Sequence, residues 1–509
     1  MRSVWKAGGL VLLVMALVWL VSMWRWQTGG RDVGGTELLV QLVVLPLVLA
    51  AALLVALKVT KSVRQAPAVA VPLDAAGSPS EAGNLASNSS AAERTCSALV
   101  AAVAIELPLP GEAAQVLRGL QEGAQRPVPD ADLTDLDGMP VFCARVADLD
   151  ADEALPEALL TAAPEQVKRS WVMLGRVLDK QLLALSELLD GLAQTTQPAQ
   201  TSMTGESTPS MKAHLSGMTH ETPVAPRDVP PRSQVAVVCA VSADWAASWQ
   251  DALHAWLKMR CGDLQADGRA MDLQVHMLPV ESAHEVWPVL DATLLRWHRE
   301  PHVPRCATLL IAADSAIDPD VVDRWQSRGE LFTAAHQSGR MPGEGAVGVL
   351  LVHAHWPDTG TLPPLARLYR PVQQTRDKSA DAQGRIGHAE IRAAMAQAVQ
   401  LSGRPAEALT MVVSDGDHRA SRTCEVFEAL LAFAPACDPM QSVLRVGDGC
   451  GDLGLTSAWL PLALAAGSLA QNPAEDSVAL AVQVQPSHHR TAIALVPWVV
   501  TSTPAVVPT

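Results

Sequence analysis

The residues of this chain that could do chemistry by type and spacing are a histidine pair, a glycine-rich turn and eight cysteines. His353 and His355 end an apolar run, so both imidazoles would share one face of a strand. A zinc site needs three or four protein ligands, and no further ligand is evident beside this pair. Capping or solvated histidines are therefore the favoured interpretation. His488 and His489 fall in an expected hairpin turn and are interpreted as surface residues.

The glycine-rich turn spans residues 447–451 and reads Gly-Asp-Gly-Cys-Gly before an expected helix. Backbone N–H groups there could cradle a phosphate. Asp448 and Asp452 would repel an anion, so a tight strand-to-helix turn is favoured. The cysteines form no Cys-x-x-Cys pair, which is typical of reduced, buried thiols in a cytosolic protein. From these residues we expect no catalytic residue, no bound cofactor and no metal site.

The composition limits the classes of partner. The net charge of −15 argues against nucleic acid, because phosphate binding needs clustered Lys and Arg. Hydrophobic residues make up 49% of the chain and charged residues 18%, so much of it can pack into a core.

The start of the chain predicts a membrane anchor. Two apolar runs, residues 7–24 and 38–57, are each long enough to cross ~30 Å of hydrocarbon as a helix. A cleaved signal peptide is disfavoured, because no small-residue cleavage site follows the first run. Lys and Arg on both outer flanks predict both termini inside, with residues 27–37 as a short external turn. We expect a double-pass protein of a bacterial inner membrane with cytoplasmic soluble domains.

Alternating helical and strand patterns follow the anchor and favour layered α/β with a mixed sheet. The expected parts are a two-helix anchor (1–64), a linker (65–94), a small α/β domain (95–193), a second linker (194–232) and a larger α/β domain (233–509). The expected strands are 98–107, 138–146, 234–239, 273–278, 308–313, 345–352, 409–413, 477–484 and 490–496. The expected helices are 112–122, 164–192, 243–259, 282–299, 321–328, 387–402, 422–433 and 454–470.

Residues 308–352 carry three motifs in register: Ala313-Asp314-Ser315 after an apolar run, the turn Gly329-Glu330-Leu331, and Pro342-Gly343-Glu344-Gly345-Ala346 before a second run. This segment resembles the β-ketoacyl synthase branch of the thiolase superfamily. The resemblance covers residues 234–498 and implies a thiolase-like body in which the strands at Thr308 and Gly345 are adjacent. It also implies a homodimer through that domain.

The resemblance also says where the reacting groups should be. Condensation needs a thiolate at a helix amino end and two imidazoles. The expected positions hold Ser282 for the nucleophile, with Ser414 and Asp452 for the imidazoles, and no cysteine lies between residues 261 and 306. Ser282 would need a nearby base to replace the thiolate, and a register shift that brings in His418 would point that ring away. The sequence therefore predicts a thiolase-like protein without the catalytic triad.

Domain order and the stretch Leu117–Gly123 also resemble the lipase adaptor family of type VI secretion. That resemblance implies a non-catalytic, membrane-anchored adaptor that binds a protein partner, a secreted lipase effector. The alternative is a divergent β-ketoacyl synthase-like enzyme, or a non-catalytic partner subunit in acyl-chain synthesis. An exposed docking surface favours the adaptor, and a nucleophile at the end of an acyl tunnel favours the enzyme.

Overall fold

The computed structural model describes residues 91–149, 163–196, 232–266, 269, 271–303 and 305–498. Pro79–Thr509 forms one compact unit, distinct from Met1–Ser78, and contains every described residue. In this part of the chain no helix is long and apolar enough to span a membrane. The two predicted spans, the linker up to residue 90, and residues 197–231 of the second linker lie outside the described residues.

A single mixed sheet organises the described body, with the strand order β11-β10-β12-β13-β8-β1-β7-β6-β4-β5 and β9 beside β13. Its strands in the first half of the sheet are β1 (Ser97–Glu106), β4 (Ser233–Ser242), β5 (Met271–Val280), β6 (Cys306–Ser315) and β7 (Glu344–His353). Those in the second half are β8 (Ala366–Tyr369), β9 (Val372–Thr375), β10 (Leu409–Ser414), β11 (Val443–Arg445), β12 (Val478–Gln483) and β13 (His489–Pro497).

The two halves of this sheet repeat one topology. Strands β5, β4 and β6 are parallel, then β7 and β1 follow antiparallel. Strands β11, β10 and β12 are likewise parallel, and β13 and β9 follow antiparallel. If β8 and β9, which both pair with β13, are counted as one interrupted strand, both halves have the order third, second, fourth, fifth, first along the chain. Antiparallel pairing of β1 with β8 joins the halves.

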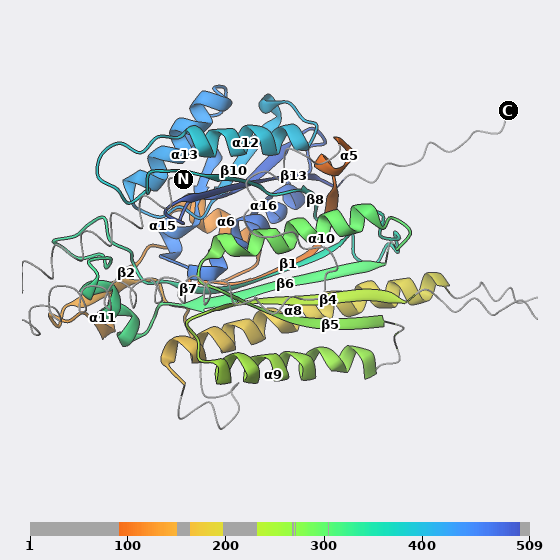
Figure 1. Ribbon diagram of the computed structural model, residues 1–509, viewed down its shortest axis with the longest axis horizontal. Coiled ribbons are helices and arrows are strands. Elements are labelled where there is room, and N and C mark those ends of the chain that lie inside the picture. The colour runs from red at the N-terminus through yellow and green to blue at the C-terminus, as the bar shows by residue number, and fades with distance from the viewer. Residues whose placement is uncertain are drawn as a thin grey trace, which may run out of the picture. The chain divides into compact units, whose positions relative to one another are not determined.

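Helices cover both halves and fill the space between them (Figure 1). On one outer face, α8 (Glu165–Thr196) and α9 (Ala247–Ala266) share an apolar core with β4, β6 and β7. On the other, α12 (Ala389–Leu401) and α13 (Ala420–Phe433) pack on β12 and β13. Between the halves lie α6 (Ala113–Glu122), α10 (Trp287–Arg299) and α16 (Leu460–Gln471), in a core that draws on strands of both.

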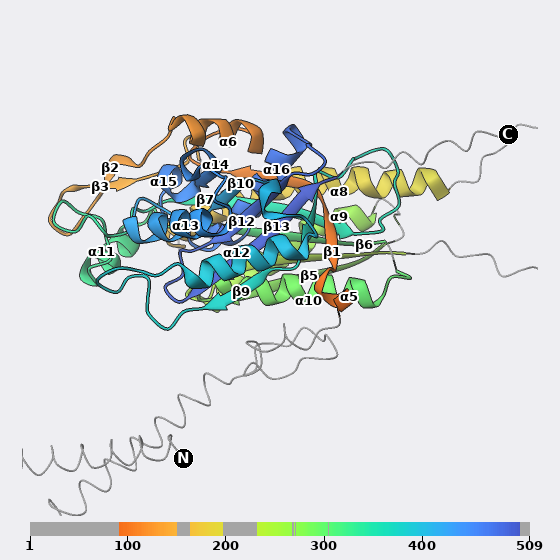
Figure 2. The same ribbon diagram turned by 90° about the horizontal axis from the view of Figure 1, so that it is seen from above.

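A small hairpin sits at one end of the body. Strands β2 (Val128–Thr134) and β3 (Pro140–Cys143) pair with each other and pack with α11 (Pro319–Ser327) around Trp325 (Figure 2). The remaining elements are short: α5 (Ala91–Arg94), α14 (Pro439–Ser442), α15 (Val446–Cys450) and the 3-10 turns η3 (Ala283–Val286), η4 (Ala406–Ala408) and η5 (Gly454–Ala458).

The local sequence explains the central layer. All ten residues of β7 are buried, because α8 covers one side of the strand and the core between the two halves of the sheet covers the other. A strand buried on both faces needs a continuous apolar run rather than alternation. At Gly348 a Cβ atom would lie 2.8 Å from side-chain carbons of both Val177 and Gln181 of α8, so glycine permits the close helix. The predicted adjacency of the Thr308 and Gly345 strands is confirmed by the β6–β7 pairing.

The layered α/β body with a mixed sheet is confirmed. The separation of a small domain, residues 95–193, from a larger one at 233 is corrected. Strand β1 lies inside the sheet between β7 and β8, and α8 packs on β1, β6 and β7. The two segments therefore share one sheet and one core, and the first strand of the body precedes the predicted boundary.

Candidate functional site

A cavity of about 930 Å³ opens where the parallel strands of both halves end. Its walls include Ser242 and Ser315, the last residues of β4 and β6, and Ser282 just after β5. From the other half come Arg419, after β10, and Gln485, after β12. The carboxyl ends of parallel strands are where α/β sheets commonly bind ligands, so this cavity is the candidate site.

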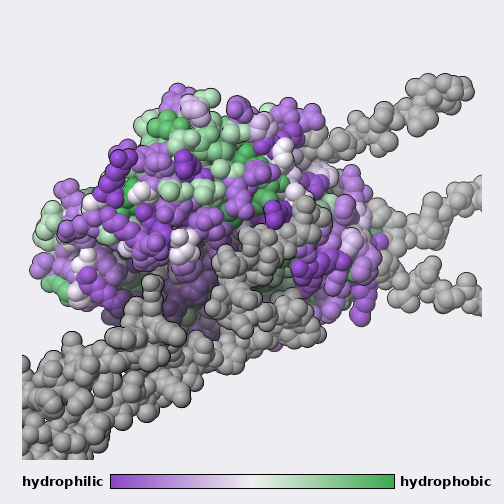
Figure 3. All heavy atoms as spheres, turned by 45° about the horizontal axis from the view of Figure 1, so that its top comes forward, coloured by the Kyte–Doolittle hydropathy of each residue, from purple (hydrophilic) through white to green (hydrophobic). Residues whose placement is uncertain are grey.

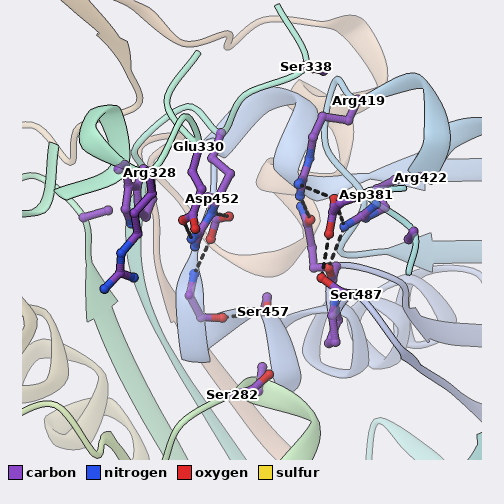
Figure 4. Close-up of a pocket in the computed structure, with 18 of the residues that line it drawn as sticks. Ser282, Arg328, Glu330, Ser338, Asp381, Arg419, Arg422, Asp452, Ser457 and Ser487 are labelled. Carbon is purple, nitrogen blue, oxygen red and sulfur yellow. Dashed lines mark hydrogen bonds and ion pairs between the residues drawn. The ribbon is translucent and has the colours of Figure 1, made fainter. Parts of the chain in front are cut away.

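The structure brings two of the three expected positions to this cavity. Ser282 and Asp452 both line it (Figure 4). Ser414 is fully buried at the end of β10, where its Oγ accepts a hydrogen bond from the Gly416 N–H at 3.0 Å. His418 is not among the lining residues, and its ring packs edge-on against Phe332 at 5.3 Å between centroids.

Asp452 is held in its charged form. Arg340 Nε donates to Asp452 Oδ2 at 2.7 Å, and the Gly454 N–H donates to Oδ1 at 3.0 Å. Burial alone would raise the pKa of Asp452, but the charge and hydrogen bond of Arg340 lower it to about 2. The Arg340 guanidinium also lies 3.9 Å from the centre of the Trp325 ring. A fixed carboxylate therefore occupies the position at which the sequence resemblance predicts an imidazole.

Among the residues that the structure describes, no base forms a hydrogen bond with Ser282 Oγ. His284, two residues along, stacks on His489 with ring centroids 3.7 Å apart. Burial and the His489 charge lower the pKa of His284 to about 4. Within the described part of the chain, no hydrogen bond joins Ser282 Oγ to His284. The prediction that His489 is a surface residue is wrong. His489 is the first residue of β13, and its half-buried ring stacks on His284.

The cysteines lie away from the cavity. All eight are among the described residues, all are free thiols, and none of them lines the cavity. Burial raises the pKa of Cys143 and of Cys450 to about 12, and that of Cys261 to about 11. These thiols remain protonated at neutral pH, so they lack the thiolate that a condensing nucleophile needs.

Asp314, from the motif after the first apolar run, anchors the floor of the cavity. Its Oδ2 accepts from the Leu455 N–H at 2.9 Å, and its Oδ1 accepts from the Ser315 N–H at 3.0 Å. Burial raises the pKa of Asp314 to about 6 despite these bonds. Gly454 approaches so closely, at φ +51°, that a Cβ atom there would lie 2.1 Å from Asp314 Oδ2. The aspartate thus ties η5 to the end of β6.

The wall opposite Arg328, Glu330 and Asp452 is a charged cluster (Figure 4). Asp381 lies on the loop between β9 and α12, and its Oδ1 accepts from Arg422 Nη2 at 2.7 Å and from Arg419 Nη1 at 3.3 Å. Ser487 Oγ donates to Asp381 Oδ2 at 2.5 Å. No sequence pattern marks this cluster, because its members come from three separate loops or helix ends.

The other sequence candidates have structural roles. His353 Nε2 donates to the Trp297 carbonyl at 3.1 Å, and its Nδ1 accepts from the His355 N–H at 3.0 Å. Residues 447–450 belong to the short helix α15 rather than to a turn, and they are packed tightly, since a Cβ atom at Gly449 would lie 2.6 Å from Leu120 Cδ2. No cluster of three metal-ligating side chains occurs in the residues that the structure describes.

No protein-family model matches the chain, and no curated protein matches it. Three similar solved structures are a ketosynthase/chain length factor, a ketosynthase domain and a β-ketoacyl synthase. The ishigamide ketosynthase/chain length factor is 16% identical, covers 79% of this chain and 99% of its own, and has a TM-score of 0.45. An oxazolomycin ketosynthase domain from Streptomyces albus is 12% identical, with coverages of 79% and 74% and a TM-score of 0.48. A β-ketoacyl synthase from Burkholderia phymatum is 11% identical, with coverages of 79% and 100% and a TM-score of 0.48.

Proposed function

We propose that this protein is a non-catalytic, membrane-anchored adaptor that binds a protein partner, a lipase effector of a type VI secretion system. The observation that carries the non-catalytic part is Asp452, fixed by Arg340 at 2.7 Å with a pKa of about 2. A negative charge at that place opposes the developing enolate of a condensation. Within the described residues no base bonds to Ser282 Oγ, and none of the eight thiols lines the cavity.

The surface supports a binding role. Large apolar side chains are exposed on the small hairpin, at Val128, Leu136, Met139 and Phe142, and Met139 is 62% exposed. Apolar residues also gather on the upper part of the mainly hydrophilic face in Figure 3. Exposed apolar groups rimmed by polar ones are typical of protein interaction sites. We assign partner docking to the hairpin, and the anchor to residues 1–64.

A homodimer is part of this proposal. Strand β5 ends the sheet order and pairs only with β4 among the described strands. An unpaired strand edge is a template for a further strand, and an antiparallel pair of β5 strands would form a symmetric dimer.

Two measurements on the full-length chain in detergent test the adaptor role. The first incubates it with acyl-thioester substrates and follows thiol release, with Ser282→Ala as the control. We expect no turnover above background, and saturable turnover abolished by Ser282→Ala would establish the enzyme alternative. The second measures binding to a lipase encoded beside its gene. Met139→Asp with Phe142→Asp should lose that binding, while Leu183→Asp, at an exposed leucine on α8, should keep it. Equal binding by both variants would contradict the hairpin assignment.

A further inference from the structure

Three donors converge on the Asp381 carboxylate. Arg422 Nη2 and Arg419 Nη1 donate to one oxygen, at 2.7 and 3.3 Å, and Ser487 Oγ donates to the other at 2.5 Å. The side chain of Asp381 is nevertheless 44% exposed, whereas that of Arg422 is 1% exposed. A surface carboxylate from a loop therefore caps a buried cation at the cavity wall. Both arginines lie at the start of α13, whereas Asp381 lies on the loop between β9 and α12. The carboxylate can therefore move away while the arginines stay in place.

The site beneath Asp381 has donor capacity left over. Arg422 Nε is buried and has no hydrogen-bond partner among the described residues. Helix α13 starts beside it, and Ala420 and Ser421 line the cavity. Their backbone N–H groups donate no hydrogen bond within the part of the chain that the structure describes. Free N–H groups and the helix dipole at this end both favour an anion.

The charges around Arg422 point the same way. Burial and the charge of Arg419 lower the pKa of Arg422, and the charges of Asp381 and Asp417 oppose that shift. Of these two carboxylates, only Asp381 accepts a hydrogen bond from Arg422. Without Asp381, its remaining acceptors are neutral: the Gln485 carbonyl at 3.1 Å and Ser421 Oγ at 3.2 Å. Arg419 keeps a second partner, because its Nε donates to Asp417 Oδ2 at 2.8 Å. Removal of Asp381 thus leaves a buried guanidinium without an anionic partner, which is costly unless another anion replaces it.

The geometry points to an oxyanion-binding site at the start of α13, formed by Arg419, Arg422 and Ser487, in which the Asp381 carboxylate occupies the place of a ligand's carboxylate or phosphate group. A ligand that carries such a group enters the cavity and displaces Asp381 into solvent. The ends of this loop are held, because Arg376 donates to Glu425 at 2.9 Å and Arg385 donates to Glu428 at 3.1 Å. The stretch around Asp381 is held less: the Ala380 N–H donates to the Ser487 carbonyl at 2.9 Å, and Lys378 Nζ bonds only within the loop, so this stretch can move locally. This inference holds whether or not the protein is an adaptor.

The test measures anion binding by the full-length chain in detergent, by calorimetry and by thermal unfolding. Inorganic phosphate and acetate are added separately at constant ionic strength, with chloride as the balancing anion. The variants are Asp381→Ala and Asp381→Asn, the latter keeping the shape and one acceptor. The matched control is Asp377→Ala, which removes an exposed acidic residue from the same loop. A double variant, Asp381→Ala with Arg419→Gln, removes the capping group and one of the donors.

Loss of an internal competitor should tighten binding of at least one oxyanion by roughly tenfold or more in Asp381→Ala. Asp377→Ala should behave like the native chain, and the double variant should lose the gain. Whichever of phosphate and acetate binds more tightly identifies the ligand group. If Asp381→Ala does not fold, Asp381→Asn decides, and a smaller gain in the same direction supports the site. Equal affinities in the native chain and the Asp381 variants would overturn the inference, as would a gain that survives Arg419→Gln.

Discussion

The buried ion pair between Arg169 and Glu344 should be a main determinant of stability. Glu344 begins β7 and is 0% exposed, and Arg169 of α8 is 5% exposed. Arg169 Nε and Nη2 donate to the two carboxylate oxygens at 2.7 and 2.6 Å. The Val146 N–H and Ser315 Oγ donate to the same carboxylate at 2.7 and 2.8 Å. One side chain thus satisfies four donors from three further segments.

Glu344→Gln removes the charge and replaces one acceptor oxygen with a donor, which leaves the charged and buried Arg169 without its close carboxylate partner. Breaking a buried pair in this way costs about 3–5 kcal/mol in the free energy of unfolding. Glu165→Gln is the matched control. Glu165 also pairs with Arg169, at 3.8 Å, but its side chain is 43% exposed, so its loss should cost less than about 1 kcal/mol.

Urea unfolding followed by tryptophan fluorescence measures both variants, because urea leaves ion pairs unscreened. Glu344→Gln with Arg169→Met removes both charges and should recover much of the lost stability. The reasoning is refuted if Glu344→Gln stays within about 1 kcal/mol of the native chain. It is also refuted if the double variant is as unstable as the single one.

Three further predictions concern buried residues of the body. Burial raises the pKa of Asp415 from 3.8 to about 7, so the folded form binds the extra proton and native stability falls as pH rises between these values. Asp415→Asn should remove that contribution, and a pH dependence of urea unfolding equal to the native one would contradict it. Gly343→Ala should destabilise by about 1–3 kcal/mol or more, since its Cβ would lie 2.1 Å from the Cys450 carbonyl oxygen. An unchanged thermal midpoint would show that this contact relaxes freely. Asp452→Asn should cost about 1.5–3 kcal/mol in urea unfolding through the weakened bond to Arg340, and a neutral result would show that the pair is not needed.

Local patterns in the sequence were enough to place most elements of the body. The apolar run before Asp314 and the run after Gly345 became β6 and β7, and the helical spacing around Trp171 became α8. Trp171 is fully buried and meets Trp256 edge-to-face, as a core residue should. Each of these signals is carried by consecutive residues, so it survives in a single sequence.

Pairing between distant segments could not be predicted in the same way. Strands β8 and β9 have four residues each, and they are strands because β1 and β13 lie beside them. The sequence also places β1 in a separate domain, because its partners β7 and β8 lie far along the chain. In the site, the family pattern led to Ser282 and Asp452, which do share the cavity. The contact between Asp381 and Ser487 joins loops 106 residues apart, and no periodicity marks it.

The position of β1 at the seam of the sheet has a consequence for biosynthesis. Strand β1 is synthesised before the other strands of this sheet. Its residue Ala98 nevertheless pairs with His353 on one side and with Leu368 on the other. On the ribosome, β1 must therefore wait with both edges open until β7 and β8 emerge. Such non-local closure makes folding slow, and an open apolar strand is the kind of segment that chaperones shield and that aggregates when left exposed. A nascent chain that stops before residue 344 has no native partner for β1, so the body closes only when its second half is translated.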